Sequence, residues 1–248
     1  MRKLGGLFII CALLTPVAAR AATTSHPREV VWRDDFSGTQ LDLTKWQPNW
    51  LGANNSSVSP PVNSAEASCY DPSQVSVSGG YLHLRAVERS CTDSHGRHYS
   101  YASGLVNSRA HYTFTYGTLK ARVYIPGSGT AEDWPSVWSD GIGQWPHTGE
   151  MDVLESLHGH NCYHFHSDAG GPGGCASTAN TAGWHTVSGV WRPGVVNYWY
   201  DGVHVGQVKT GITGSPMFVI LNLGLSNSIS PPMKAPAEML VDWVEVKQ

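Results

Sequence analysis

The stretch TLKARVYI, residues 118–125, alternates between apolar and other side chains at every step. Its apolar face carries Leu119, Ala121, Val123 and Ile125. A period of two is typical of an antiparallel β-strand that turns one face to a core and the other to solvent. We therefore expect a half-buried strand at these residues.

Other runs rich in Val, Ile, Tyr and Trp recur along the chain and are separated by turn signals such as Gly79-Gly80, Pro193-Gly194 and Asp201-Gly202. Gly and Pro interrupt every candidate helix. Many short strands with regular turns predict an all-β fold, in which two antiparallel sheets pack face to face as a sandwich or jelly roll. We expect its further strands at Gln74–Val77, Tyr81–Ala86, Leu105–Phe114, Thr186–Trp191, Val195–Tyr200, Val203–Val208, Met217–Leu223 and Met239–Lys247.

The composition excludes several classes of protein. Charged residues make up 14% of the 248 residues, against about 25% in an average soluble domain, and there are ten Trp and ten Tyr. This is not the composition of a disordered chain. Sixteen Lys and Arg against nineteen Asp and Glu leave no basic excess to neutralise a phosphate backbone, so nucleic acid is not an expected partner.

The first residues resemble a secretory signal peptide. Arg2 and Lys3 precede an apolar run, and small residues at Ala19 and Ala21 flank a cleavage point. A membrane anchor is the alternative, but Pro16 breaks the run before it reaches the ~20 apolar residues that cross a bilayer. We expect a signal peptide at 1–21, a flexible tail at 22–30 and one β-sandwich domain at 31–248, in a secreted, extracellular protein with no membrane attachment after cleavage.

Four cysteines remain once the signal peptide, with Cys11, is removed. An even number in an oxidising compartment favours two disulfides, which four cysteines can form in three ways. We favour the pairs Cys69–Cys91 and Cys162–Cys175, because each closes a local loop rich in Gly, Ser and Asp. Free buried thiols are the alternative.

Three acids lie close together in WPHTGEMDVLES, residues 145–156. Glu150 and Asp152 share one face of a regular strand, whereas Glu155, at an odd offset, points to the other. A β-bulge near Val153 and Leu154 would return Glu155 to the same face, and bulges often re-aim side chains beside active sites. The alternative is a strand whose solvent face happens to be acidic.

Such a row of acids suits hydrolysis of a glycosidic bond with retention of configuration. That reaction needs a carboxylate nucleophile and a second carboxylic acid that protonates the leaving oxygen, and Glu150 and Glu155 are the candidates. Asp152 between them is expected to raise the pKa of the acid or to orient the nucleophile. Flat aromatic rings stack on sugars, and three lie just before the acids: Trp134, Trp138 and Trp145.

With these motifs the chain resembles glycoside hydrolase family 16, in its laminarinase-like endo-β-glucanase branch. The match runs from Asp35-Phe36-Ser37-Gly38 through WPSVW at 134–138 and GEMDVLE at 149–155 to LVDWVEV at 240–246. The resemblance implies a β-jelly-roll with a substrate cleft on its concave face and a retaining endo-acting mechanism. It also implies that Glu150 is the nucleophile, Glu155 the acid/base and Asp152 the assisting acid.

Two residues separate Asp152 from Glu155. This spacing resembles that of the laminarinase-like and marine-galactan branches of the family more than that of the lichenases. The absence of a basic cleft favours a neutral β-1,3- or mixed β-1,3/1,4-glucan as substrate. A galactan hydrolase, a transglycosylase and a non-catalytic glucan-binding jelly roll remain alternatives. We expect a monomer whose catalysis needs no cofactor.

Four histidines follow the acids, and His164 and His166 share a strand face. Such a pair can bind zinc, but the resemblance requires no metal for catalysis. The resemblance places a histidine on the strand after the acids, so we expect His166 to line the cleft and to bind substrate or a catalytic carboxylate. His158 and His160 are expected in loops. Asn222 can face either the cleft or the core, and we favour the core.

Asp242 lies in the last, otherwise apolar strand, where a carboxylate without a partner is costly. In many members of the family the matching Asp helps to hold a structural calcium far from the cleft, with oxygens from the segments around Asp35 and Gly80. Calcium prefers oxygen ligands of this kind. Asp242 is therefore a tentative ligand of a structural calcium.

Overall fold

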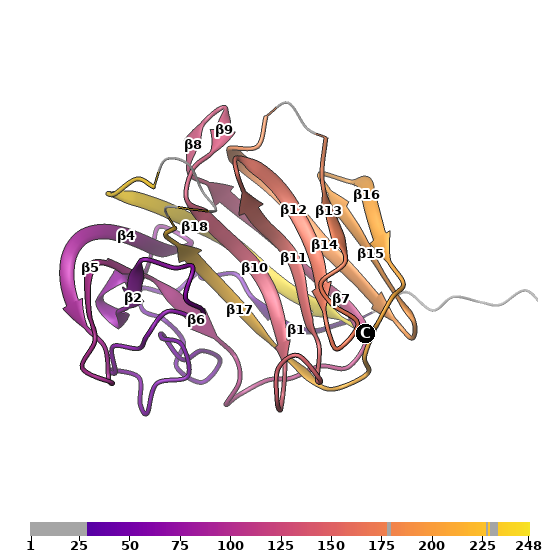
Figure 1. Cartoon of the computed structure of the whole chain (residues 1–248), viewed down its shortest axis with the longest axis horizontal. Helices are drawn as coiled ribbons and strands as arrows, with labels where there is room; N and C mark the ends of the chain where they lie inside the picture. Colours follow the sequence, from indigo (N-terminus) through magenta and orange to yellow (C-terminus); the bar gives the residue numbers. More distant parts are fainter. Residues whose placement is uncertain (1–28, 178–179, 227, 229–232) are drawn as a thin grey trace, which may run out of the picture.

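A computed structural model describes residues 29–177, 180–226, 228 and 233–248. The predicted signal peptide and all but the last two residues of the predicted tail lie outside these residues. The described residues form two large β-sheets, a small hairpin and one 3-10 turn, η1 (Pro72–Gln74) (Figure 1). Within them, no helix has the length and apolar character needed to cross a membrane.

The larger sheet has ten strands. Its main path runs β16 (Val203–Val208), β15 (Val195–Tyr200), β14 (Gly183–Arg192), β7 (Gly117–Ile125), β18 (Ala237–Lys247), β4 (Tyr81–Thr92), β5 (His98–Ser103) and β2 (Ser68–Tyr70). β1 (Val30–Asp34) pairs with β18, and β3 (Val75–Ser78) pairs with β4. The β2–β5 pair is parallel, whereas the other pairs of this sheet are antiparallel.

The smaller sheet has six strands and is antiparallel throughout. Its order is β13 (Gly173–Cys175), β12 (His160–His166), β11 (Glu150–Leu157), β10 (Trp134–Gly141), β17 (Met217–Gly224) and β6 (Leu105–Asn107). In Figure 1 its central strands curve side by side across the middle of the molecule. The hairpin of β8 (Gly127–Ser128) and β9 (Thr130–Ala131) projects at one end.

The strand predicted at residues 118–125 is confirmed as β7. Its residues alternate between buried and half-buried from Gly117 to Ile125, as the period of two predicts. The all-β jelly-roll prediction is confirmed as well, because the fold consists of two large sheets that are almost entirely antiparallel.

The strand predicted at Leu105–Phe114 is wrong in its second half. β6 ends at Asn107, and the next residues form a turn in which the Ser108 carbonyl accepts hydrogen bonds from the backbone amides of His111 and Tyr112. The backbone amides and the carbonyl form their hydrogen bonds within this turn, so they are not available for pairing with a neighbouring strand.

The main core fills the space between the two sheets. Side chains such as Leu119, Val123 and Val187 from the larger sheet meet Val137 and Met151 from the smaller one, all fully buried. Each apolar side chain of this size stabilises the fold by about 1.5–3 kcal/mol when it leaves water. A second, smaller cluster lies apart from this core and consists of Tyr70, Leu105, Trp138, Phe218 and Ile220, with Trp50 and Val62 against it.

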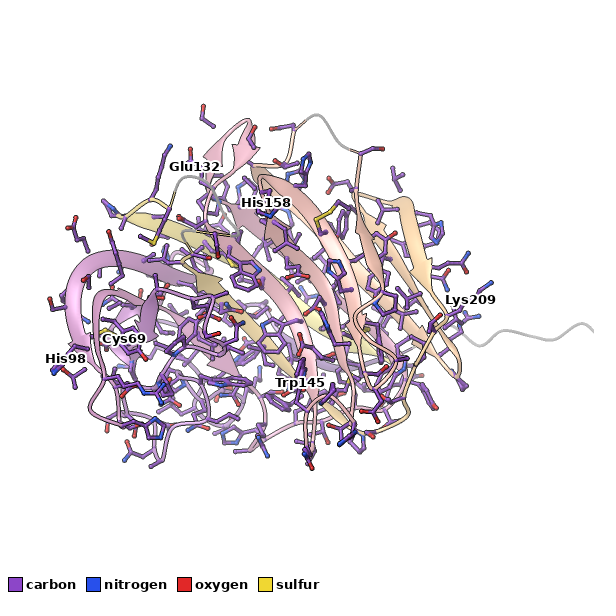
Figure 2. All side chains as sticks on the ribbon, viewed as in Figure 1. Cys69, His98, Glu132, Trp145, His158 and Lys209 are labelled. Atoms are coloured by element: carbon purple, nitrogen blue, oxygen red, sulfur yellow. A yellow bond between two sulfur atoms is a disulfide. The ribbon has the colours of Figure 1, made fainter. Side chains whose placement is uncertain are left out.

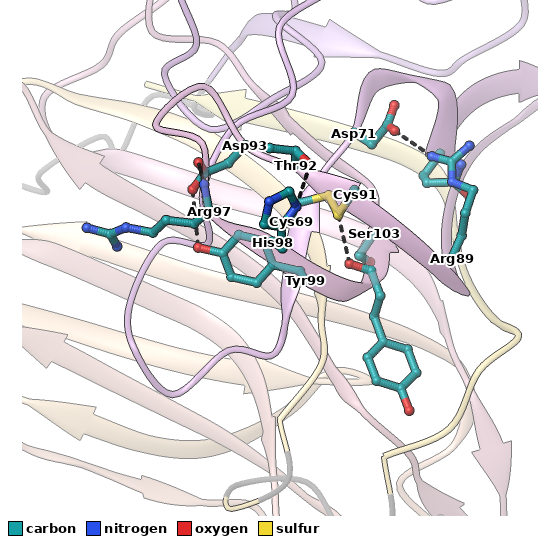
Figure 3. The surroundings of a disulfide bond; sticks show 12 residues. Cys69, Asp71, Arg89, Cys91, Thr92, Asp93, Arg97, His98, Tyr99 and Ser103 are labelled. Carbon is teal, nitrogen blue, oxygen red and sulfur yellow. Dashed lines mark hydrogen bonds and ion pairs between the residues drawn. A yellow bond between two sulfur atoms is a disulfide. The ribbon is translucent and has the colours of Figure 1, made fainter.

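Both predicted disulfides are confirmed. Cys69 of β2 is bonded to Cys91 of β4 across 22 residues, and Cys162 of β12 is bonded to Cys175 of β13 across 13 residues. Figure 3 shows the first bond, near which Arg89 pairs with Asp71. A cross-link over a loop of this size stabilises a fold by about 3 kcal/mol in the chain-entropy account.

Candidate active site

The acidic segment forms β11, and its predicted bulge is confirmed. Asp152 lies opposite His164 of β12, and Glu155 lies opposite Cys162, so three steps on β11 match two on β12. The register with β10 shifts at the same place. The extra residue puts Glu155 on the same face as Glu150 and Asp152, while Val153 and Leu154 are buried in the core.

Gly149 sets the direction in which the chain enters β11. Its φ is +84°, a conformation that favours glycine, and a Cβ there would lie 2.3 Å from Oγ1 of Thr213. The Thr213 hydroxyl in turn donates a 2.9 Å hydrogen bond to the Thr148 carbonyl. This close packing fixes the backbone directly before Glu150.

A cleft of about 700 Å³ lies over the exposed face of the smaller sheet. Side chains of β10, β11 and β12 line it, together with loop residues on either side. Figure 2 shows the labelled Trp145 and His158 at different ends of these central strands. The lining residues are Trp50, Val62, Asn63, Trp134, Trp138, Asp140, Trp145, Glu150, Glu155, Leu157, His158, His164, His166 and Gly171.

Two of the three predicted tryptophans are bound directly to the predicted catalytic acids. The Trp145 indole donates a 2.6 Å hydrogen bond to Oε2 of Glu150, and the Trp134 indole donates one of 3.2 Å to Oε2 of Glu155. Trp145 remains 55% exposed, so a large part of its ring is open to a ligand. These rings therefore orient the two carboxylates and also offer apolar surface to a sugar.

Trp138 lies deeper than the other two. Its ring is 6% exposed and packs against Trp50 at 5.6 Å between ring centroids. Its indole donates a 2.7 Å hydrogen bond to Asn222, which in turn donates to the Tyr70 hydroxyl at 2.9 Å. Trp138 forms the floor of the cleft. Asn222 is buried but lines a small cavity beneath the cleft, whereas its neighbours Leu221 and Leu223 belong to the main core, so its predicted place in the core is wrong.

Two histidines of β12 face the acids. His166 lies opposite Glu150 in register, and its Nε2 is 3.3 Å from Oδ2 of Asp152. His164, which carried no predicted role, forms a short hydrogen bond through Nδ1 to Oε1 of Glu155. His164 is thus the histidine that contacts the predicted acid/base.

Burial and nearby negative charges raise the pKa values of two of the three acids on β11, Asp152 and Glu150. The pKa of Asp152 lies well above its usual value because the group is buried and Glu155 is close. The pKa of Glu150 is raised by burial and by Asp152, while His166 and the Trp145 hydrogen bond act in the opposite direction. Asp152 and Glu150 hydrogen-bond to one another, which requires one of them to keep a proton. The hydrogen bond lowers the pKa of Asp152, against the larger effects of burial and Glu155.

Asp140, Trp50 and Glu66 carried no prediction from the sequence. Asp140 lies opposite Glu150 on β10, and burial raises its pKa to about 6. Its even offset from Trp138 could have revealed it. Trp50 and Glu66 come from the long segment between β1 and β2, where no periodic pattern indicates which side chains reach the sheet. His158, predicted in a loop, lies in the turn after β11 and also lines the cleft.

Comparison with curated proteins finds distant relatives along most of the chain. Glucan endo-1,3-beta-glucosidase A1 of Niallia circulans is 26% identical over 260 residues, which cover 88% of this chain and 37% of the relative. Endo-1,3-1,4-beta-glycanase EglC of Rhizobium meliloti is 27% identical over 86% of this chain and 50% of its own length. Keratan-sulfate endo-1,4-beta-galactosidase of Sphingobacterium multivorum is 26% identical over 92% of this chain and 57% of its own length. The chain thus spans only about a third to three fifths of these relatives.

Among solved structures, the endo-beta-1,3-glucanase from Pyrococcus furiosus superimposes with a TM-score of 0.74 at 21% identity. The superposition covers 89% of this chain and 94% of that one. The likeness shows that the two proteins share a fold. A scan against protein-family profiles finds no match.

One group of side chains in the cleft has the composition of a metal site. Asp152, Glu155, His164 and His166 each offer one ligand atom, and these atoms lie within 4.8 Å of one another. In the structure His164 hydrogen-bonds to Glu155, and His166 Nε2 lies 3.3 Å from Oδ2 of Asp152, an oxygen without a hydrogen-bond partner among the described residues. Glycosidic hydrolysis by two carboxylates needs no metal.

Asp242, the tentative calcium ligand, forms an ion pair with Arg122 in the structure. Oδ2 of Asp242 accepts a 2.6 Å hydrogen bond from Arg122, whose guanidinium supplies the compensating charge. The Asp35 carboxylate accepts hydrogen bonds from Ser37. A cation bound by Asp242 would lie beside the positive charge of Arg122.

Proposed function

We propose that the chain is a secreted, retaining endo-β-glucanase that hydrolyses internal bonds of β-1,3- or mixed β-1,3/1,4-glucan. The observation that carries the proposal is the row of Glu150, Asp152 and Glu155 on one face of a tryptophan-lined cleft. The glucanase relatives support the choice of glucan.

The reaction proceeds by double displacement. Glu155 donates a proton to the glycosidic oxygen as the Glu150 carboxylate attacks the anomeric carbon, which breaks the glycosidic bond and forms a glycosyl ester. Glu155, now a carboxylate, takes a proton from water, and the resulting hydroxide attacks the same carbon and releases Glu150. Glu150 must be ionised to attack, so in the active form the proton that the pair shares lies on Asp152. Asp152 then donates a hydrogen bond to Glu150 and stabilises it both as a nucleophile and as a leaving group.

The cleft suits a neutral polysaccharide. Its lining, within the described part of the chain, contains no Lys or Arg, whereas it contains four tryptophans. Sulfate groups would meet the carboxylates of Glu150, Glu155 and Asp140 without a compensating base. The runner-up is a galactan hydrolase, which the relative from Sphingobacterium multivorum favours. Sizing of the reaction products distinguishes a glucanase from a galactan hydrolase. The substrates to be incubated with the protein are laminarin, barley glucan, lichenan, agarose and carrageenan.

The variant E150Q tests the assignment of the nucleophile. Because glutamine cannot form the glycosyl ester, we expect kcat on laminarin to fall by more than about a thousandfold, with the thermal unfolding midpoint retained. The exposed acid Glu88 provides the matched control, and E88Q is expected to keep full activity. An E150Q protein that cuts laminarin at the parent rate would sink the proposal.

Azide separates the two carboxylates. With an aryl β-laminarioside as substrate, azide added to E150A attacks from the face that the carboxylate has vacated and yields an α-glycosyl azide. Azide added to E155A attacks the glycosyl ester on Glu150 and yields the β-azide. The opposite pairing of variant and product would exchange the two roles.

Two further outcomes would indicate the alternative functions. Oligosaccharides with newly formed bonds at high acceptor concentration would indicate a transglycosylase, and retention on insoluble glucan without new reducing ends would indicate a binding protein.

The remaining parts of the proposal concern the whole protein. A signal peptide at 1–21 and export to the extracellular medium are supported by the two disulfides, which persist in oxidising compartments. A monomeric state is also part of the proposal. The tentative calcium at Asp242 stays a prediction. Loss of thermal stability in EDTA, restored by calcium but not by magnesium, would support it.

A further inference from the structure

A fourth carboxyl group, that of Glu66, faces the catalytic acids across a small cavity. The cavity has a volume of about 50 Å³, and its lining includes Glu66, Glu150, Asp152 and Glu155. This volume exceeds the ~30 Å³ share of one water molecule but is too small for a sugar ring. It therefore has room for one hydroxyl or hydroxymethyl group.

The cavity opens into the main cleft. The two spaces share six lining residues: Val62, Asn63, Trp134, Trp138, Glu150 and Glu155. A sugar that lies over Glu150 and Glu155 in the cleft can thus direct a substituent toward Glu66. Within the described residues, the lining of the small cavity holds four acids and no Lys or Arg, so an uncharged substituent fits it best.

Glu66 has one free oxygen. The side chain is 9% exposed and accepts hydrogen bonds from the Tyr70 hydroxyl and the Val62 backbone amide. Its Oε2 is fully buried and has no hydrogen-bond partner in the described part of the structure. A buried polar atom of this kind costs about 1–3 kcal/mol unless a ligand or water satisfies it.

A chain of buried hydrogen bonds fixes the direction in which Glu66 donates. The Trp138 indole donates to Asn222, Asn222 donates to the Tyr70 oxygen, and Tyr70 therefore directs its own proton toward Glu66. The oxygen of Glu66 that faces Tyr70 and Val62 is thus an acceptor. A proton on the carboxyl group belongs on the other oxygen, Oε2.

Burial keeps this proton in place near neutral pH. Desolvation raises the pKa of Glu66 to about 8, and its two hydrogen bonds only partly oppose the rise. The titratable groups that line the cavity or contact Glu66 are Tyr70, Glu150, Asp152 and Glu155, all of which are neutral or negative. Ionised Glu66 would lose its donor and add a charge to this acidic cavity.

The backbone around Glu66 is firmly anchored. The amide of Ala67 donates to the carbonyl of Leu225 at 2.7 Å, and the next residues enter β2, which the Cys69–Cys91 disulfide joins to β4 (Figure 3). A site held in this way loses little conformational entropy when it binds a ligand.

We propose that Glu66 is a substrate-binding residue whose Oε2–H donates a hydrogen bond to a free hydroxyl of the sugar that lies over Glu150 and Glu155. This role rests on the function proposed above and adds a determinant of specificity to it. The hydroxyl must be unsubstituted and uncharged, because the cavity is small and acidic.

Three variants test the role with laminarin as the probe. E66Q keeps a donor and an acceptor, E66M keeps the approximate size but neither group, and E88Q is the exposed control. At pH 6 we expect E66Q to retain its KM within about twofold and E66M to raise KM by roughly five- to tenfold. Above pH 8 we expect kcat/KM of the parent to decline more than that of E66Q, because only the parent ionises at this position. The comparison with E66Q removes the contribution of the ionisable groups that the two proteins share.

A substrate-free measurement keeps the inference testable if E66M does not fold. The infrared difference between the parent and E66Q at pH 6 should contain the carbonyl band of a protonated carboxylic acid, which disappears by pH 10. An unchanged KM in E66M, an equal alkaline decline in E66Q, or absence of that band would overturn the role of Glu66. If the parent protein cuts no glucan, the proposed function fails instead, and the infrared result still reports on Glu66.

Discussion

Trp145 contributes two separate properties to the cleft, an apolar ring and an indole N–H. The N–H donates to Glu150 at 2.6 Å and lowers the pKa of that carboxyl, against the effects of burial and Asp152. A nucleophile must be ionised to attack, so loss of this donor should narrow the pH range of activity from the acid side.

The variant W145F removes the donor and keeps an aromatic ring. We expect the acid limb of the pH profile of kcat/KM to move to higher pH, with a loss of about tenfold at pH 5, since hydrogen bonds to charged groups are worth about 1.5–3 kcal/mol before screening at this exposed site. W199F, at an exposed tryptophan outside the cleft lining, is the control. An acid limb that does not move in W145F would show that the N–H has no part in setting the ionisation of Glu150.

The three acids of β11 could be predicted from the sequence, whereas Trp50 and Glu66, from the long segment between β1 and β2, could not. The period of two, with one bulge, predicted that Glu150, Asp152 and Glu155 share a face, and the structure places all three on the cleft face. Trp50 and Glu66 reach the cleft through turns whose course depends on contacts with distant segments, such as the hydrogen bond from Ala67 to Leu225. Nothing in the local sequence encodes such contacts.

Among the elements, the bulge in β11 decides whether Glu155 belongs to the site. It compensates for one extra residue, so Glu155 remains opposite Cys162 although it is three positions after Asp152. Deletion of Leu154 would place the glutamate two positions after Asp152 in a regular strand, still opposite Cys162. Insertion of one alanine after Leu154 would move it to the core face or one residue pair along β12.

These two variants have opposite expected outcomes. We expect the deletion to retain measurable hydrolysis of laminarin, at a cost of about 2–5 kcal/mol in the free energy of unfolding for the lost core side chain. We expect the insertion to lose activity by more than about a thousandfold. Denaturant unfolding and initial rates measure both quantities. A deletion variant that folds but is as inactive as the insertion would mean that the bulge does more than restore the face of Glu155.

Strand ends were harder to predict than the strands themselves. The apolar residues after Asn107 continue a strand-like pattern, but the Ser108 carbonyl closes a turn there and ends β6. β10, in contrast, carries Trp134, Pro135 and Trp138 and was recognised only as an aromatic cluster. It is a central strand buried on both sides, so it lacks the alternation that marks a half-buried strand.

For the whole molecule, the buried acids predict how stability depends on pH. Burial raises the pKa of Glu66 to about 8 and those of Asp133 and Asp140 to about 6, and the pKa values of Glu150 and Asp152 also lie well above their usual range. In the unfolded chain these carboxyls titrate near pH 4. At pH values between the unfolded and the folded pKa of these carboxyls, the folded protein therefore holds more protons than the unfolded chain.

Because the folded protein holds the excess protons, its free energy of unfolding falls as pH rises, by about 1.4 kcal/mol per pH unit for each excess proton. The stabilisation from a protonated carboxyl is complete below its unfolded pKa and is lost as the pH passes its folded pKa. We expect denaturant unfolding to show higher stability at pH 5.5 than at pH 8.5. The slope above pH 6.5 should be smaller in E66Q, which has no proton to lose there, and unchanged in E88Q. Stability that rises with pH over this range would mean that these carboxyls are ionised in the folded protein.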